Sequence, residues 1–225
     1  YSSDIHGSFL SSQRADAIKH IIEDEDAVIV TTIDALMEPI QPKSKLLDKK
    51  LRLYEGMVIQ PTALSQALTE LGYHHTSEVE TSGEYAVRGG IFDIYPMSSE
   101  EPYRVEFFDD EIDTIRMFDI ASQRSTDRTE EIEIYPADNT DAHADKSEHV
   151  SLYTYFGSDA LIVLDDPVRI KAQADNTEQE FAESTERRLE KGIEQGEGVP
   201  DEIYSAAEIM EMITSHRALL IAGLD

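Results

Sequence analysis

The stretch that decides the fold is residues 83–96, which read GEYAVRGGIFDIYP. Two short alternating segments, residues 84–88 and 91–95, lie on either side of a Gly-Gly pair. Two strand-like segments joined by a glycine turn are typical of an antiparallel β-hairpin. The sequence therefore predicts an antiparallel sheet at the centre of the chain.

More segments of the same kind surround this hairpin. Turn-forming sequences rich in Pro, Ser or Asp separate them, as expected for strands that reverse direction at each connection. The predicted strands lie at residues 51–54, 103–108, 112–118 and 131–135.

One helix is predicted within the same region. Pro61 is placed to begin it and Gly72 to end it, and Leu64, Leu68 and Leu71 form a single apolar stripe between them. Residues 44–137 are therefore predicted to form an α+β module, with one helix on an antiparallel meander.

The flanking segments follow another pattern. Residues 1–40 predict a helix at about 11–23 and a short buried strand at 27–30. Residues 149–225 predict buried strands at 160–164 and 218–222 and, between them, a charged helix at 167–191, a glycine-rich break and a short helix near 206–213. Helices that alternate with continuous apolar strands indicate a parallel α/β sheet. We expect 1–40 and 149–225 to form one layered domain into which 44–137 is inserted, with 138–148 as a linker.

Composition excludes several classes of function. The 225 residues contain 47 acidic and 19 basic side chains, a formal charge of -28, which repels nucleic-acid phosphates and anionic lipids. There is no cysteine, which fits a reducing compartment and excludes disulfides and thiolate sites. The longest apolar run, residues 218–222, is too short to span a membrane. The start at Tyr1 and the stop just after a strand suggest a fragment of a larger protein.

Catalytic motifs are absent from the sequence. No glycine is followed by lysine, so there is no Walker phosphate loop, and no dinucleotide-binding glycine motif follows a strand. The seven histidines lack metal-binding spacing. Acidic clusters occur where turns or helix ends are predicted, and Asp is favoured there. A carboxylate-dependent metal enzyme using Asp93, Asp109 and Asp110 stays open as an alternative.

The scarce cations of the central module are more informative. Between Leu53 and Ile115 there are thirteen acidic residues but only two basic ones, Arg88 and Arg104. Strand alternation in residues 103–108 places Arg104 and Phe108 on the face opposite the core. Arginine and aromatic side chains together are typical of interface hot spots. The alternative is that Phe108 is covered and that both arginines only pair with local carboxylates.

Residues 83–96, 102–113 and 118–125 strongly resemble the nucleotide-excision-repair module shared by UvrB and the bacterial transcription-repair coupling factor family. Residues 28–37 resemble the segment that leads into this module in the coupling factors. Residues 149–225 are more weakly similar to the second half of their degenerate helicase-like domain. The chain is thus identified as an N-terminal fragment of a coupling-factor family member.

This resemblance implies a docking role. In the family the module binds the damage-recognition subunit UvrA, and the matching contact residues are Arg88, Arg104 and Phe108. The family protein is an ATP-dependent DNA translocase that acts on RNA polymerase stalled at damaged DNA. Its ATP, magnesium and DNA are bound by domains absent from this chain, so the fragment is expected to be non-catalytic, without a cofactor, and cytoplasmic.

The resemblance also implies an intramolecular partner. Family members hide the docking face through a contact with their own C-terminal region. A further alternative is that the chain is a structural, autoinhibitory clamp that uses the charged helix at residues 167–191.

Overall fold

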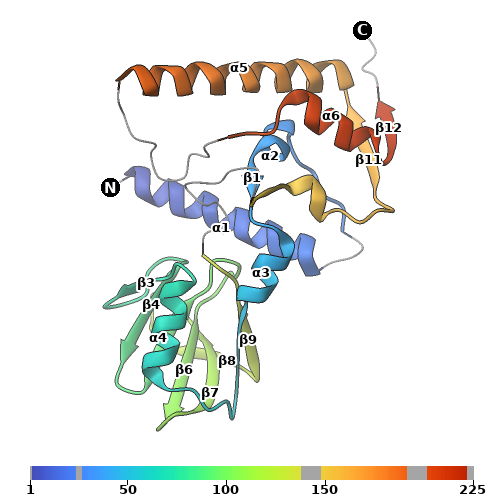
Figure 1. Cartoon of the computed structure of the whole chain (residues 1–225). Helices are drawn as coiled ribbons and strands as arrows, with labels where there is room; N and C mark the ends of the chain where they lie inside the picture. Colours follow the sequence, from blue (N-terminus) through green and yellow to red (C-terminus); the bar gives the residue numbers. More distant parts are fainter. Residues whose placement is uncertain (1, 24–26, 138–147, 192–201, 222–225) are drawn as a thin grey trace. The chain divides into compact units, whose positions relative to one another are not determined.

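The computed structural model describes residues 2–23, 27–137, 148–191 and 202–221 (Figure 1). The chain divides into two compact units. Unit 1 comprises residues 1–23 and 44–139, and unit 2 comprises residues 24–43 and 140–225.

Unit 1 is built around a six-stranded sheet in the order β3-β4-β5-β6-β7-β8. Its strands are β3 (His74–Thr76), β4 (Glu84–Arg88), β5 (Ile91–Tyr95), β6 (Tyr103–Phe108), β7 (Glu111–Phe118) and β8 (Ser125–Thr129). All neighbours pair antiparallel except β3 and β4, which are parallel. A separate antiparallel pair joins β2 (Leu51–Tyr54) to β9 (Glu131–Ile134). The predicted hairpins are confirmed. Strand β8 was not predicted, because it is a polar edge strand without an apolar face.

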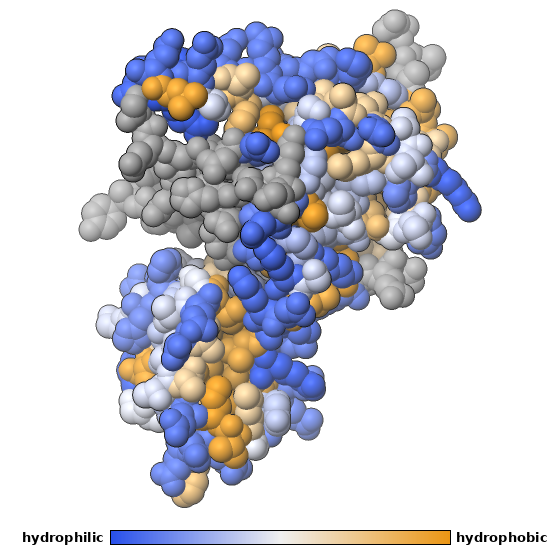
Figure 2. All heavy atoms as spheres, viewed as in Figure 1, coloured by the Kyte–Doolittle hydropathy of each residue, from blue (hydrophilic) through white to orange (hydrophobic). Residues whose placement is uncertain are grey.

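Helix α4 (Pro61–Glu70) supplies the helical side of the core. Pro61 occupies its first turn, and Gly72 follows its end with a φ of +85, which favours glycine. Leu64 and Leu68 are fully buried in one cluster with sheet residues that include Phe92 and Val105. Figure 2 shows a strip of hydrophobic side chains beside α4. The predicted α+β module, a helix packed on an antiparallel sheet, is therefore present.

A buried tyrosine connects three segments of this core. The Tyr73 hydroxyl donates to the carbonyl of Tyr135 at 3.0 Å and accepts from the backbone N–H of Met97 at 3.1 Å. Burial raises the pKa of Tyr73, so the hydroxyl stays protonated at neutral pH. The hydroxyl thus ties the end of β5 to the segment after β9.

Removing this hydroxyl should destabilise unit 1. We expect Tyr73→Phe to lower the free energy of unfolding by about 1–3 kcal/mol, because the N–H of Met97 and the carbonyl of Tyr135 lose their partner in a buried place. Urea denaturation measures the change. Tyr54→Phe is the matched control, because Tyr54 is exposed and its hydroxyl has no hydrogen bond within the described residues. An equal effect of the two substitutions would contradict the role of Tyr73.

Two further helices belong to this part of the chain, α1 (Ser2–Glu23) and α3 (Lys43–Lys49). The hydroxyl of Ser12 donates to the carbonyl of Met97 at 3.0 Å, and Tyr135 donates to Glu23 at 2.8 Å. Ala15 is buried in the main cluster of unit 1. The prediction that this N-terminal helix groups with residues 149–225 is therefore corrected, because its polar and apolar contacts are made with the central module.

The described residues of unit 2 form one short antiparallel strand pair, one parallel strand pair and three α-helices. Strand β1 (Pro39–Ile40) pairs antiparallel with β10 (Val150–Ser151), and β11 (Leu161–Asp165) pairs parallel with β12 (Arg217–Ile221). The helices are α2 (Ile33–Met37), α5 (Pro167–Lys191) and α6 (Ala206–Thr214), with a 3-10 turn η1 (Leu152–Tyr155). The predicted helices and strands of residues 149–225 are thus observed as a parallel α/β arrangement.

The core of unit 2 lies around α2 and α6. It contains Ile33, Leu36, Met37, Tyr153, Leu164, Ala174, Tyr204, Ala206, Ile209 and Ile213. Ser205 caps α6 by accepting from the N–H of Glu208, whose carboxylate accepts from the N–H of Ser205 in return. None of the described helices has both the length and the apolar composition that crossing a membrane requires.

Burial in unit 2 differs from the predictions. Residues 27–30 form no strand, and Val28 and Val30 are almost fully exposed, because no described neighbour pairs with their backbone. Leu161, Val163 and the apolar residues of β12 are also exposed, and Figure 2 shows hydrophobic side chains around β11 and β12. Two strands alone cannot cover each other's faces. The linker residues 138–147 and the glycine-rich break lie outside the described residues.

Candidate functional site

The outer face of the six-stranded sheet carries the three predicted site residues. Val105 is buried in the core of unit 1, whereas Phe108 is 76% exposed. Glu106 faces Thr114 and Phe107 faces Ile112, so the irregular residue lies on β7 and the alternation of β6 is unbroken. Phe108 therefore lies on the same face as Arg104, as predicted, and no described element covers it.

A single carboxylate holds both arginines. Arg104 donates to Asp93 through two nitrogens, Nε to Oδ1 at 2.7 Å and Nη2 to Oδ2 at 2.9 Å. Arg88 donates to the same Oδ2 through Nη2 at 3.0 Å. The Asp93 side chain is only 2% exposed, and a carboxylate so deeply buried needs such partners. One part of the alternative is thus observed, because both arginines pair with a local carboxylate; the other part is not, because Phe108 is exposed.

Arg104 is the more enclosed of the two arginines. It donates to the backbone and side-chain oxygens of Gln123 at 3.1 and 3.3 Å, and its guanidinium lies 4.6 Å from the ring centre of Phe118. The hydrogen bond to Asp93 raises the pKa of Arg104. Only 15% of its side chain is exposed, against 50% for Arg88. Arg104 therefore fixes the local structure as well as contributing charge to the face.

Arg88 is arranged to present donors outward. Asp93 engages only Nη2 of Arg88, and its Nε and Nη1 have no partner within the described residues. The ion pair limits the freedom of the half-exposed side chain. The face thus offers a restrained guanidinium and an exposed aromatic ring, whereas Arg104 lies beneath as part of their support.

The aspartates of the metal hypothesis do not come together as a site. Asp93 is occupied by two arginines. Asp109 has a φ of +55 in the tight turn between β6 and β7, and Asp110 accepts from the N–H of Ile59 through its carbonyl at 2.8 Å. In the part of the chain that the structure describes, no group of three His, Asp or Glu residues could hold a metal ion.

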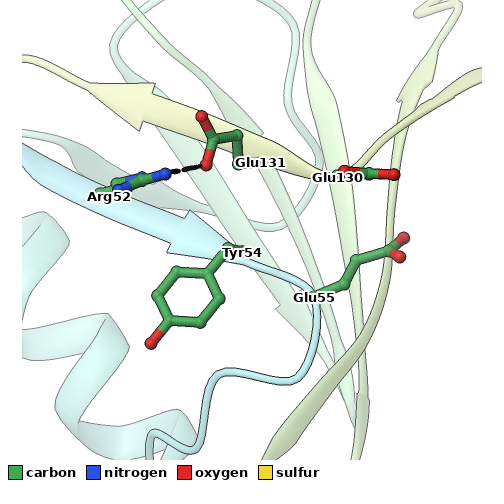
Figure 3. A pocket seen from close by; sticks show the side chains of 5 residues that line it. All are labelled: Arg52, Tyr54, Glu55, Glu130 and Glu131. Carbon is green, nitrogen blue, oxygen red and sulfur yellow. Dashed lines mark hydrogen bonds and ion pairs between the residues drawn. The ribbon is translucent and has the colours of Figure 1, made fainter.

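An open hollow lies elsewhere on unit 1, lined by Arg52, Tyr54, Glu55, Glu130 and Glu131 (Figure 3). Its charged groups are largely satisfied within the protein: Arg52 pairs with Glu131, and Glu55 pairs with Arg128. The hydrogen bond from Arg128 lowers the pKa of Glu55. This hollow brings together none of the predicted site residues and is not the candidate site.

Two supporting residues were not predicted. Asp93 had a signal in the sequence, since it is the one charged residue within the otherwise apolar strand 91–95 and lies directly opposite Arg104. Gln123 gave no signal. It reaches Arg104 through a connection whose backbone takes a φ of +57 at Gln123.

The central part of the chain is similar to a known protein family. Residues 51–139 match the family model of the UvrB interaction domain. The matched residues cover most of unit 1 and include Arg88, Arg104 and Phe108. The resemblance identified in the sequence is confirmed.

The chain also resembles curated relatives over a longer stretch. It is 38% identical over 132 residues to the transcription-repair-coupling factor of Escherichia coli K12, which covers 59% of this chain and 11% of that protein. It is 37% identical over 128 residues to the transcription-repair-coupling factor of Bacillus subtilis 168, covering 57% and 11%. The chain therefore matches about a tenth of the length of these relatives.

Proposed function

We propose that this chain is a docking module that binds UvrA and brings it to RNA polymerase stalled at damaged DNA. One observation carries the proposal. Within a UvrB interaction domain, an exposed phenylalanine and a half-exposed arginine share a face with the buried carboxylate that restrains the arginine. Phe108 and Arg88 make the contacts, and Arg104 supports them.

The chemistry of the face suits protein binding. Aromatic and arginine side chains are enriched among interface hot spots, where each supplies a large contact area or several hydrogen bonds. A guanidinium already restrained by Asp93 loses less conformational entropy when it binds. The cations are also rare in an acidic surrounding, which favours contact with one complementary surface over general attraction to anions.

The rest of the proposal concerns the larger protein. We place this chain within a cytoplasmic coupling factor whose other domains bind ATP, magnesium, DNA and RNA polymerase. The chain itself needs no cofactor and performs no catalysis. The α+β module is proposed to be inserted in a degenerate helicase-like domain, and the C-terminal region of the parent protein is proposed to cover the docking face at rest.

The direct test is a calorimetric titration of the chain with purified UvrA. We expect saturable binding that requires neither a nucleotide nor a metal ion bound to this chain. The absence of any binding at micromolar concentrations of both proteins would reject the proposal. A parallel titration with magnesium and manganese addresses the metal-enzyme alternative, for which heat of binding at millimolar metal is the supporting result.

A second candidate role rests on helix α5. Ala174 is its only buried residue within the described chain, and Val168 and Leu189 are exposed near its two ends. A long helix with so little covered surface suits an autoinhibitory clamp on another part of the parent protein. Binding of this chain to the parent's C-terminal half, lost on Val168→Ser with Leu189→Ser and accompanied by no affinity for UvrA, would favour this role.

A further inference from the structure

Three arginines from three neighbouring strands form a row on the outer face of the sheet. Arg104 on β6 lies directly opposite Arg116 on β7, and Arg116 lies directly opposite Arg128 on β8. Directly opposite residues point to the same face, and like charges in such positions are destabilising. This arrangement is unexpected in a chain with a formal charge of -28.

The two outer arginines are neutralised by local carboxylates. Arg104 is held by Asp93, and Arg128 donates to both oxygens of Glu55 at 2.7 and 2.8 Å. Glu55 Oε1 also accepts from the N–H of Ile115 at 3.3 Å. Both carboxylates are therefore already engaged by the outer arginines.

The middle arginine has no such partner. The Nε of Arg116 is buried without a hydrogen bond, and no carboxylate of the described residues forms an ion pair with this side chain. Glu106, a neighbour on the same face, accepts from the hydroxyl of Thr114 at 3.1 Å. The charge of Arg116 contributes to the lowered pKa of Glu55, but the two side chains form no ion pair. Arg116 thus has a buried donor without a hydrogen bond, which is costly for folding, and no carboxylate of its own among the described residues.

We propose that Arg116 is a further partner-binding residue, whose guanidinium receives a carboxylate from the protein that docks on Phe108 and Arg88. The inference rests on the proposed function, so the partner is UvrA. An incoming carboxylate would supply the counter-charge that Arg116 lacks among the described residues, and the planar guanidinium suits a carboxylate bound through both oxygens. The charge of the whole chain disfavours a nucleic-acid phosphate as the occupant.

The test measures UvrA affinity and thermal stability on the same variants of the full chain. We expect Arg116→Ala to weaken UvrA binding by about tenfold to a hundredfold, the range of a typical hot spot. We expect Arg116→Lys, which keeps the charge and loses the forked geometry, to lie between Arg116→Ala and the wild type. The Tm of Arg116→Ala should be unchanged or higher, because the substitution removes a buried donor without a hydrogen bond and breaks no ion pair among the described residues.

Arg52→Ala is the matched control, because Arg52 is an exposed strand arginine already paired with Glu131. We expect its UvrA affinity to stay within about twofold of the wild type, as for a residue outside the contact. Wild-type affinity of Arg116→Ala, with binding still weakened by Phe108→Ala, would overturn the role of Arg116 and leave the proposed function standing. A clear fall in the Tm of Arg116→Ala would show a structural role and also overturn the inference. No UvrA binding by the wild type would reject the proposed function itself.

Discussion

Asp93→Ala is expected to lower the free energy of unfolding of unit 1 by about 3–5 kcal/mol, the range for breaking a buried ion pair by removing one partner. The Asp93 side chain is almost fully buried and accepts three hydrogen bonds from two guanidinium groups. Its removal leaves Arg104, only 15% exposed, without its ion-pair partner and opposite a second arginine, Arg116. Urea denaturation of the purified chain measures the loss.

Two control substitutions separate charge from general damage to the sheet. Asp93→Asn keeps the shape and one acceptor oxygen, so its cost should be smaller than that of Asp93→Ala. Asp127→Ala removes an exposed strand aspartate with no ion pair among the described residues, and its effect should stay within about 0.5 kcal/mol. If Asp93→Ala costs no more than Asp127→Ala, then Asp93 does not hold the two arginines in place.

The shared pairing of Asp93 with Arg88 and Arg104 affects which substitutions can test binding. Arg104→Ala would leave the buried carboxylate of Asp93 with Arg88 as its one ion-pair partner within the described residues. A loss of UvrA binding in that variant would combine a missing contact with a disturbed sheet. Arg88 and Phe108, both more exposed, are the better probes of the face itself.

Phe108→Ala is expected to weaken binding to UvrA by about 2–4 kcal/mol, the cost of removing an aromatic hot spot. The ring is 76% exposed in the free chain, so its truncation should change the free energy of unfolding by no more than about 0.5 kcal/mol. Titration calorimetry gives the affinity, and urea denaturation confirms the fold.

Leu47→Ala is the control for Phe108→Ala. Leu47 is another exposed apolar residue of unit 1, on α3, and we expect its truncation to leave UvrA affinity unchanged. Equal losses from the two substitutions would mean that Phe108 has no special place in the contact.

The central sheet could be predicted from the sequence because its signals are local. Glycine, proline and aspartate turns mark the ends of β4, β5 and β6, and period-two alternation assigns Val105 and Phe108 to opposite faces. The exposure of Phe108 follows from that alternation. Strand β8 carries no apolar alternation, since it is an edge strand held by backbone pairing with β7.

The interactions within the site could not be predicted in the same way. The shared pairing of Arg88 and Arg104 with Asp93 depends on the register of three strands, and Gln123 approaches from a separate connection. The row formed by Arg104, Arg116 and Arg128 likewise depends on cross-strand register. The scarcity of basic residues in the sequence indicated Arg88 and Arg104 as site residues, but it did not predict the contacts that position them.

Unit 2 shows the limit of apolar runs as a signal. Residues 161–165 and 217–221 form strands as expected, yet most of their apolar side chains are exposed, and residues 27–30 form no strand. An apolar run predicts that a segment can be buried, but burial requires neighbours that pack on it. Such neighbours are missing among the described residues. The placement of the strands at residues 161–165 and 217–221 was therefore correct, whereas their predicted burial and the strand at residues 27–30 were wrong.

The most direct test of the docking role is the affinity of UvrA for a chain carrying both Arg88→Ala and Phe108→Ala. The double substitution removes the two exposed groups of the face and keeps the pairing of Arg104 with Asp93, so the folded structure should survive. We expect an unchanged urea midpoint together with a loss of UvrA binding of at least about a hundredfold. Wild-type affinity in this folded variant would contradict the assignment of the outer sheet face as the UvrA-binding surface.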